Sequence, residues 1–214
     1  MVHFGVEFAP NTIGTSFADR EHTWNEVNNR VAKSASGLAA IGAGKGIHIA
    51  ILALNSDKYF ECLNAIPWSG SVMVPLNIRW SVKENLYSLN DSECSILFFD
   101  DAFIDTAKEL KLKCDNIKHM IYIGENSAPE GTLDYEEFIA NATPMQPVKC
   151  DYDDLVGIFY TGGTTGFPKG VMLSHKNLWT SSVCLISAMK INTEGERYLH
   201  AAPMFHLADI GIGY

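Results

Sequence analysis

The strongest signal in this chain lies in residues 155–175, which run LVGIFYTGGTTGFPKGVMLSH. The apolar run at 155–160 predicts a strand, and a second strand is predicted at 171–173, after a loop rich in glycine and threonine. Ser174 then stands where its side-chain oxygen can cap a helix. The inner side of that helix is predicted to carry Leu178, Val183, Ile186 and Met189.

The loop between the two strands has the composition of a polyphosphate-binding site. Three glycines within five positions allow positive φ and let a ligand approach the backbone, whose amides can converge on an anion. Threonine hydroxyls add donors that can also contact Mg²⁺, and a lysine adds a positive charge on a flexible stem. The alternative is a glycine-rich hairpin without a ligand. The residues predicted to hold the phosphates are Thr161, Gly162, Gly163, Thr164, Thr165, Gly166 and Lys169.

Two common nucleotide-binding loops do not fit this stretch. A Walker A loop, G-x-x-x-x-G-K-[ST], leads directly into a helix, whereas Gly166 is followed by Phe167, Pro168 and Lys169 and then by a strand. The dinucleotide fingerprint G-x-G-x-x-G is not matched either. The loop instead joins two predicted strands.

Upstream of the loop, strands and helices are predicted to alternate. Two capping boxes, Thr23 with Glu26 and Ser81 with Glu84, indicate helix starts, and residues 1–22 are predicted to be an irregular lead-in. The expected strands are 48–54, 72–76, 95–99 and 118–123, and the expected helices are 23–41, 56–67, 81–90, 102–112 and 134–140. This order is typical of an α/β fold with mostly parallel sheets flanked by helices.

Composition and charge exclude several classes of protein. The net charge of −9 leaves no basic patch for nucleic acid. Five cysteines without a C-x-x-C pair argue against a disulfide framework or a zinc site and favour buried free thiols in a reducing cytosol. Neither a leader peptide nor a transmembrane run is recognised, so a cytoplasmic protein is expected.

Residues 160–170, YTGGTTGFPKG, resemble the AMP-binding signature of the adenylate-forming superfamily, which includes acyl- and aryl-CoA synthetases and peptide-synthetase adenylation domains. The usual signature has Thr-Ser-Gly where this chain has Thr-Gly-Gly, a departure that some acyl-CoA ligases share. The order of upstream elements and the turn at 74–77 are similar as well, so the resemblance covers nearly the whole chain. It implies an N-terminal α/β subdomain at 1–150 and the start of the AMP-binding core at 151–214.

The resemblance implies ATP, Mg²⁺ and coenzyme A as cofactors and a carboxylic acid, fatty or aryl, as substrate. The carboxylate would attack the α-phosphate of ATP, and the acyl-adenylate would then pass to a thiol, commonly that of coenzyme A. Thr161 to Lys169 would wrap the β- and γ-phosphates, with Thr161 contacting the magnesium ion and Lys169 acting in catalysis. The resemblance also leaves room for a homodimer.

A second stretch, APMFHL at 202–207, resembles a family segment that lies near the acyl pocket. It implies that His206 borders the carboxylate site as a second catalytic residue, without a role in proton transfer. The alternative is an ordinary, partly buried histidine.

Three later features of the family have no counterpart in these 214 residues. They are its ribose-binding aspartate, its Tyr-Gly-x-Thr-Glu element and the lysine of its small C-terminal domain. We therefore expect a fragment, inactive by itself, of a parent roughly two to three times longer. Two rivals stay open, an adenylation domain that loads a carrier protein and a non-catalytic nucleotide-binding module that kept the fold. A kinase-like phosphotransferase would need a base and metal-binding acids after the loop, which we do not find.

Overall fold

The computed structural model describes residues 2–162, 166–189 and 197–213, and for 211–213 the backbone alone. The strands of its main sheet are β3 (His48–Leu52), β4 (Val72–Pro75), β5 (Ile96–Phe99), β6 (His119–Tyr122), β7 (Leu133–Asp134), β8 (Leu155–Thr161) and β9 (Lys169–Ser174). Within the described residues, these seven strands follow the order β7-β6-β5-β3-β4-β8-β9. Neighbours run parallel except β8 and β9, which form an antiparallel hairpin at one edge.

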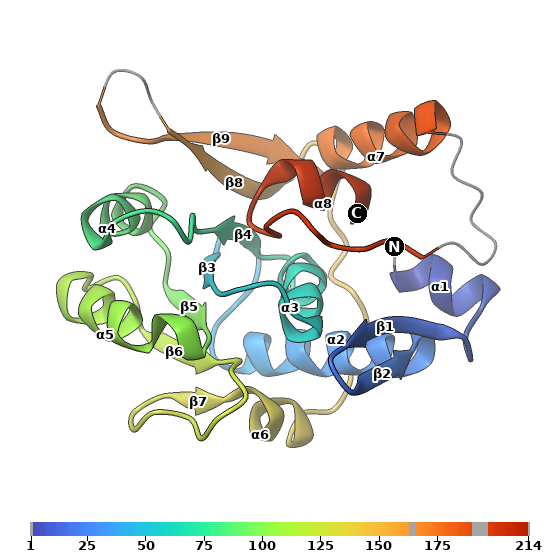
Figure 1. The fold of residues 1–214 in the computed structure, drawn as a ribbon, viewed down its shortest axis with the longest axis horizontal. Helices are drawn as coiled ribbons and strands as arrows, with labels where there is room; N and C mark the ends of the chain where they lie inside the picture. Colours follow the sequence, from blue (N-terminus) through green and yellow to red (C-terminus); the bar gives the residue numbers. More distant parts are fainter. Residues whose placement is uncertain (1, 163–165, 190–196, 214) are drawn as a thin grey trace.

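Helices cover both faces of this sheet (Figure 1). One face packs against α2 (Trp24–Ala40), α3 (Asp57–Trp68) and α6 (Tyr135–Ala140), and the other against α4 (Val82–Asp91), the short 3₁₀ helix η1 (Asp101–Phe103) and α5 (Ile104–Lys113). Along β3, Ile49 and Ile51 belong to the first core, whereas Ala50 and Leu52 belong to the second. This alternation is the period-two pattern of a strand buried on both faces. The predicted α/β class with a mostly parallel sheet is confirmed.

Helix starts follow the predicted local signals. Thr23 with Glu26 and Ser81 with Glu84 form reciprocal capping boxes at α2 and α4. Ser56 accepts a hydrogen bond from the Tyr59 amide at 3.0 Å and caps α3. The start of α7 (His175–Met189) is closed by Ser174, whose hydroxyl oxygen accepts from the amide of Asn177 at 3.3 Å. Side-chain oxygens thus satisfy helix amides that lack an intrahelical partner.

The prediction of an irregular lead-in at 1–22 is wrong. This region contains α1 (Val2–Phe8) and an antiparallel hairpin of β1 (Ile13–Phe17) and β2 (Arg20–Thr23). Trp24 fills the space beside it, since a Cβ added to Gly5 or Gly14 would lie 2.2 or 2.7 Å from the indole. Such short strands show too little alternation for recognition by pattern, and long-range packing stabilises them instead.

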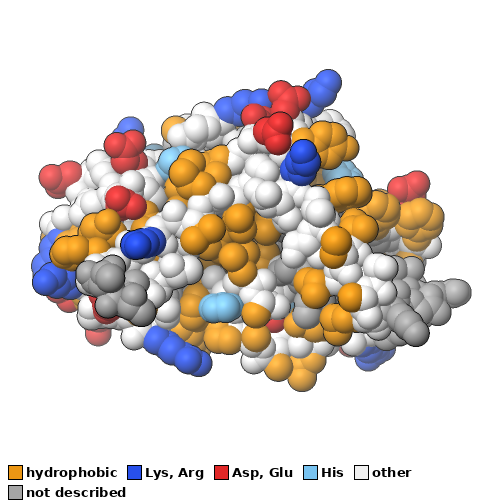
Figure 2. All heavy atoms as spheres, turned by 90° about the horizontal axis from the view of Figure 1, so that it is seen from above, with side chains coloured by type: hydrophobic (Ala, Val, Ile, Leu, Met, Phe, Trp, Pro, Cys, Tyr) orange, Lys and Arg blue, Asp and Glu red, His pale blue; other side chains and the backbone are white. Residues whose placement is uncertain are grey.

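The predicted inner side of α7 is also mostly wrong. Leu178 is 2% exposed, but Val183, Ile186 and Met189 are exposed to 44%, 39% and 56%. The helix lies at the top of Figure 1, and Figure 2 shows hydrophobic side chains exposed on the face seen from above. Cys184, on the same helix, is exposed, so the expectation of buried thiols fails there. None of the described helices is long and apolar enough to cross a membrane.

Candidate functional site

The predicted phosphate loop is the tip of the β8–β9 hairpin. Thr161 ends β8 and Lys169 begins β9, and the two residues face each other in the antiparallel register. The Thr161 hydroxyl donates to the Lys169 carbonyl oxygen at 3.4 Å, across the neck of the loop. Both side chains are exposed. The fold therefore brings these two predicted site residues together, while their binding roles stay predictions.

Two glycines of the loop are described, Gly162 and Gly166, whereas Gly163, Thr164 and Thr165 lie outside the described residues. Gly166 has a φ of 127°, a conformation that residues with a side chain rarely adopt. Glycine is therefore favoured at this position by the backbone angle, and no described residue other than its chain neighbours has an atom within 4 Å of a Cβ added there.

Helix α4 supports the hairpin from one side. The hydroxyl of Tyr160 donates to the Asp91 carboxylate at 2.6 Å, and the ring of Phe167 stacks on Tyr87 with centroids 4.9 Å apart. Burial and the hydrogen bond to Asp91 raise the pKa of Tyr160, so its phenol stays protonated and can donate. Tyr87 and Asp91 were not among the predicted site residues. Their only sequence signal was an i,i+4 spacing at the end of the helix predicted at 81–90.

Lys169 has no acidic partner in the part of the chain that the structure describes. The salt bridges found there use other cations, such as Lys45, whose ammonium lies 3.1 Å from the Asp154 carboxylate. An exposed ammonium without a carboxylate partner is available to an anion from outside the chain.

His206 lies on a separate segment, at the start of α8 (Leu207–Gly213). Its side chain is exposed, and its Nδ1 accepts a hydrogen bond from the Ala208 amide at 3.2 Å. In the neutral ring, the proton therefore resides on Nε2. No hydrogen bond or ion pair among the described residues joins His206 to Thr161 or Lys169. The His206 side chain is thus more exposed than the alternative of an ordinary, partly buried histidine expected, while its role in the site stays a prediction.

A buried carboxylate stabilises the segment that carries His206. Asp209 is fully buried, accepts from Nδ1 of His200 at 2.6 Å and receives the Tyr198 hydroxyl at 3.4 Å. Burial and the nearby Asp209 charge raise the pKa of Tyr198. Asp209 was missed by sequence reasoning, although a lone aspartate in the apolar run 207–212 was a usable signal.

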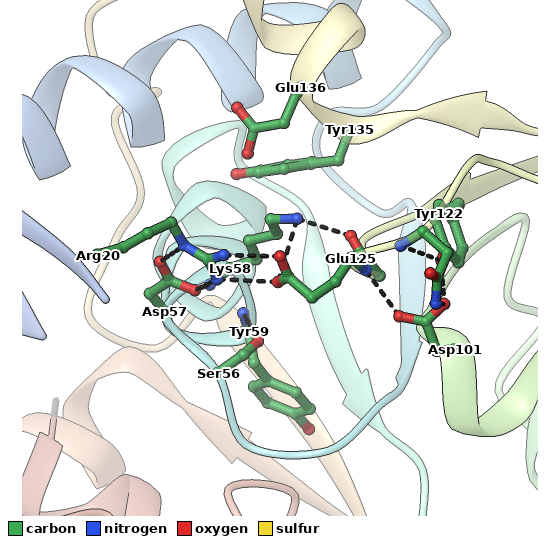
Figure 3. Close-up of polar contacts among 12 residues, drawn as sticks. Arg20, Ser56, Asp57, Lys58, Tyr59, Asp101, Tyr122, Glu125, Tyr135 and Glu136 are labelled. Carbon is green, nitrogen blue, oxygen red and sulfur yellow. Dashed lines mark hydrogen bonds and ion pairs between the residues drawn. The ribbon is translucent and has the colours of Figure 1, made fainter. Parts of the chain in front are cut away.

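A second group of charges lies at the start of α3, and its members pair with one another (Figure 3). Arg20 donates to both oxygens of Asp57 at 2.8 Å, and to both oxygens of Glu125 at 2.6 and 2.8 Å. Lys58 donates to the Gly124 carbonyl oxygen at 2.7 Å and lies 3.4 Å from Glu125. Because these charges pair with one another, the cluster ties the β1–β2 hairpin to α3 and to the loop after β6.

A surface hollow of about 570 Å³ lies beside α2 and α6, lined among others by Gly37, Asp134 and Phe138. None of the predicted site residues lines it. The residue chemistry of the hairpin loop, and not the size of this hollow, therefore indicates the candidate site.

Comparisons with known proteins agree on one family. A sequence model of the AMP-binding enzyme family matches residues 6–213. The long-chain-fatty-acid–CoA ligase of Thermus thermophilus is 34% identical over 187 residues, which cover 86% of this chain and 34% of that protein. The feruloyl-CoA synthase of an Amycolatopsis species is 35% identical over 207 residues, covering 97% of this chain and 39% of that protein. The chain thus spans roughly a third to two fifths of the length of these relatives.

Solved structures agree with the sequence relatives. The ATP-bound MatB of Rhodopseudomonas palustris superposes with a TM-score of 0.83 at 25% identity. The match covers 96% of this chain and 40% of that one. The shared fold therefore extends over nearly the whole chain.

Proposed function

The chain belongs to the family of AMP-binding enzymes, and on that premise we propose that the full-length protein is an acid–thiol ligase. A carboxylate oxygen of the substrate attacks the α-phosphorus of ATP, and pyrophosphate leaves with the electrons of the broken P–O bond. The thiolate of coenzyme A then attacks the acyl carbonyl and AMP leaves. The single observation that carries the proposal is the β8–β9 hairpin, which places Thr161 opposite Lys169, a lysine for which no acidic partner is found among the described residues.

The proposed role of the loop is to bind the β- and γ-phosphates. Backbone amides of a glycine-rich turn and threonine hydroxyls donate to phosphate oxygens, and Lys169 neutralises charge. The residues assigned to this role are Thr161, Gly162, Gly163, Thr164, Thr165, Gly166 and Lys169. A donor aimed at charge that develops in the transition state contributes about 3 kcal/mol.

Thr161 fits a contact to Mg²⁺, because the residue is exposed and its hydroxyl makes, among the described residues, a long hydrogen bond of 3.4 Å to the Lys169 carbonyl oxygen. Magnesium favours oxygen ligands and is completed by substrate phosphates and water. The ion would supply charge neutralisation on the triphosphate. The proposal assigns Thr161 only the position of one oxygen ligand.

We assign His206 to the border of the carboxylate site. Since Nδ1 accepts from Ala208, the neutral ring offers an Nε2–H donor that suits a carboxylate oxygen. No proton transfer is needed, because the attacking carboxylate is ionised at neutral pH. Lys169 and His206 thus act on opposite partners of the reaction, the nucleotide and the acid.

The substrate is proposed to be a fatty or aryl acid, with coenzyme A as acceptor. The names of two relatives, a long-chain-fatty-acid–CoA ligase and a feruloyl-CoA synthase, support these two classes. A role in fatty-acid metabolism, a cytoplasmic location and a homodimer belong to the same proposal. Loading of a carrier protein is the alternative acceptor chemistry. A non-catalytic nucleotide-binding module is the other rival, and the presence of Thr161 and Lys169 argues against it.

The division into an N-terminal subdomain at 1–150 and the start of the AMP-binding core at 151–214 is also proposed. Strand β8 pairs with β4, so the units share one sheet at their junction. We further propose that these 214 residues do not turn over alone. Pyrophosphate release from ATP with a panel of fatty and aryl acids measures this, and robust turnover by the 214-residue chain contradicts it.

The test of the loop is acid-dependent ATP–pyrophosphate exchange by the full-length protein. Lys169→Ala and Thr161→Ala are expected to lower kcat/KM by about 10²-fold or more. Lys149→Ala, which removes an exposed lysine outside the loop, is the matched control and should leave the rate unchanged. Equal rates for all three variants and the wild type would rule out the assigned phosphate site.

A further inference from the structure

The side-chain amide of Asn55 joins the segment before α8 to the loop that follows β3. Asn55, in the loop between β3 and α3, donates from Nδ2 to the carbonyl oxygens of His200 and Ala202 at 2.8 and 2.7 Å. Its Oδ1 accepts from the amide of Met204 at 2.8 Å. Both donor hydrogens and the acceptor oxygen are therefore used on one stretch of backbone, 145 to 149 residues away in sequence.

Asn55 is itself held on both sides. The amide of Leu54 donates to the Asp100 carboxylate at 2.7 Å, and Ser56 caps α3 through the Tyr59 amide. The residues before and after Asn55 are thus fixed to β5 and to α3. The Asn55 amide therefore lies at the carboxyl end of β3, the edge where ligands of open α/β sheets bind.

The far end of the same segment is anchored separately. Met204 is 1% exposed, Ile210 is 3% exposed, and Asp209 is buried against His200. His206 lies between these anchors and is exposed. Figure 1 shows this segment, in red, crossing above α3 on its way to α8.

We propose that Asn55 is a positioning residue, which sets the place of His206 in the acid-binding part of the site by fixing residues 200–204. The inference rests on the proposed function, since it assigns the fastened segment to the carboxylate side. Three hydrogen bonds from one planar amide define a single arrangement of the backbone, and a shift of about 1 Å in a binding group costs up to about 10²-fold in rate. Asn55 touches neither nucleotide nor acid in this scheme.

Amide hydrogen exchange tests the fastening without any reference to activity. In the full-length protein, Asn55→Ala should accelerate exchange at the Met204 amide by about tenfold or more, because its acceptor is lost. Ser56→Ala is the matched control, because it removes the cap of α3 at the adjacent position and leaves the three hydrogen bonds between Asn55 and residues 200–204 in place. Equal protection of Met204 in Asn55→Ala and the wild type would overturn the proposal.

Acid-dependent ATP–pyrophosphate exchange tests whether Asn55 affects binding of the carboxylic acid. Asn55→Ala should raise KM for the carboxylic acid about tenfold while KM for ATP stays within about twofold. Asn55→Asp keeps the shape of the side chain but places a carboxylate against two carbonyl oxygens, so it should also raise KM for the acid and leave KM for ATP unchanged. This second variant provides the same test if Asn55→Ala fails to fold.

Two results of the kinetic test count against the inference. The first is an unchanged acid KM in a variant whose Met204 amide exchanges faster, and the second is an equal rise in acid KM in Ser56→Ala. A wild-type protein that activates none of the acids would instead refute the proposed function, and the exchange measurement would still decide whether Asn55 fastens the segment.

Discussion

Gly170 shows how closely the hairpin that carries the phosphate loop is packed. A Cβ at this position would lie 2.8 Å from the Cγ2 methyl of Ile158 and 3.1 Å from the ring of Tyr160. Ile158 is 6% exposed and its methyl is fixed on a branched carbon, so it cannot easily move aside. A larger residue at this position would press on the Tyr160 ring, whose hydroxyl donates to Asp91.

Gly170→Ala is expected to destabilise the chain by about 1–3 kcal/mol through overpacking. Urea unfolding measures the change. Gly162→Ala is the control, because no described residue other than its chain neighbours has an atom within 4 Å of the added Cβ, and it should cost less than about 1 kcal/mol. Equal losses in the two variants would show that contacts around Gly170 are not the cause.

Helix α7 shows how an element can be recognised correctly while its buried side is not. Its start and cap were predicted, but Leu178 and Ser182 are its buried residues within the described part of the helix. The helix presents Val183 and Ile186 to solvent at more than a third of their surface. Burial along α7 is thus set by the elements that contact it, such as α8 and β9, and not by its own apolar spacing.

Two alanine substitutions on α7 test whether burial follows the contacting elements or the apolar spacing of the helix. In the 214-residue chain, Leu178→Ala should cost about 2–5 kcal/mol, the usual range for a buried leucine. Ile186→Ala should cost less than about 1 kcal/mol, because its side chain already contacts solvent. Thermal or urea unfolding of both variants decides the matter, and similar losses would contradict the described orientation of the helix.

The charge cluster around Arg20 acts on the molecule as a whole, since it joins residues 20, 57 and 125. Burial raises the pKa of Asp57, but the hydrogen bonds and charge of Arg20 outweigh it, so the pKa lies below its ordinary value. The Glu125 carboxyl pKa is lowered too, by Arg20 and Lys58. A carboxyl with a depressed folded pKa stabilises the protein above its unfolded pKa and loses that stabilisation as the pH falls through the folded value.

Asp57→Asn should lower the free energy of unfolding at pH 7 by about 1–3 kcal/mol, because Arg20 keeps Glu125 but loses a buried charged partner. The difference from the wild type should shrink as the pH falls below about 4. Unfolding curves from pH 7 to pH 3 measure it. Glu21→Gln, which changes an exposed carboxylate next to Arg20 in sequence, is the control; a pH-independent difference for Asp57→Asn would contradict the assigned charge pairing.

Sequence alone determined the features that depend on neighbours a few residues apart. The capping boxes at Thr23 and Ser81, the alternation of strands and helices, and the two strands β8 and β9 that flank the glycine-rich stretch are all of this kind. Their physical basis is local, because a cap bonds residues three apart and a strand repeats every two. The family signature at 160–170 belongs here too, since it was recognisable without coordinates.

Only the tertiary structure decided which distant groups meet. Asn55 bonds to Met204 across 149 residues, Arg20 to Glu125 across 105, and Tyr160 to Asp91 across 69. No spacing in the sequence encodes such pairs, because they form only when the packing of helices on the sheet brings their backbones together. The same packing stabilises the β1–β2 hairpin and leaves one side of α7 in solvent, since burial is a property of the assembled surfaces and not of one segment.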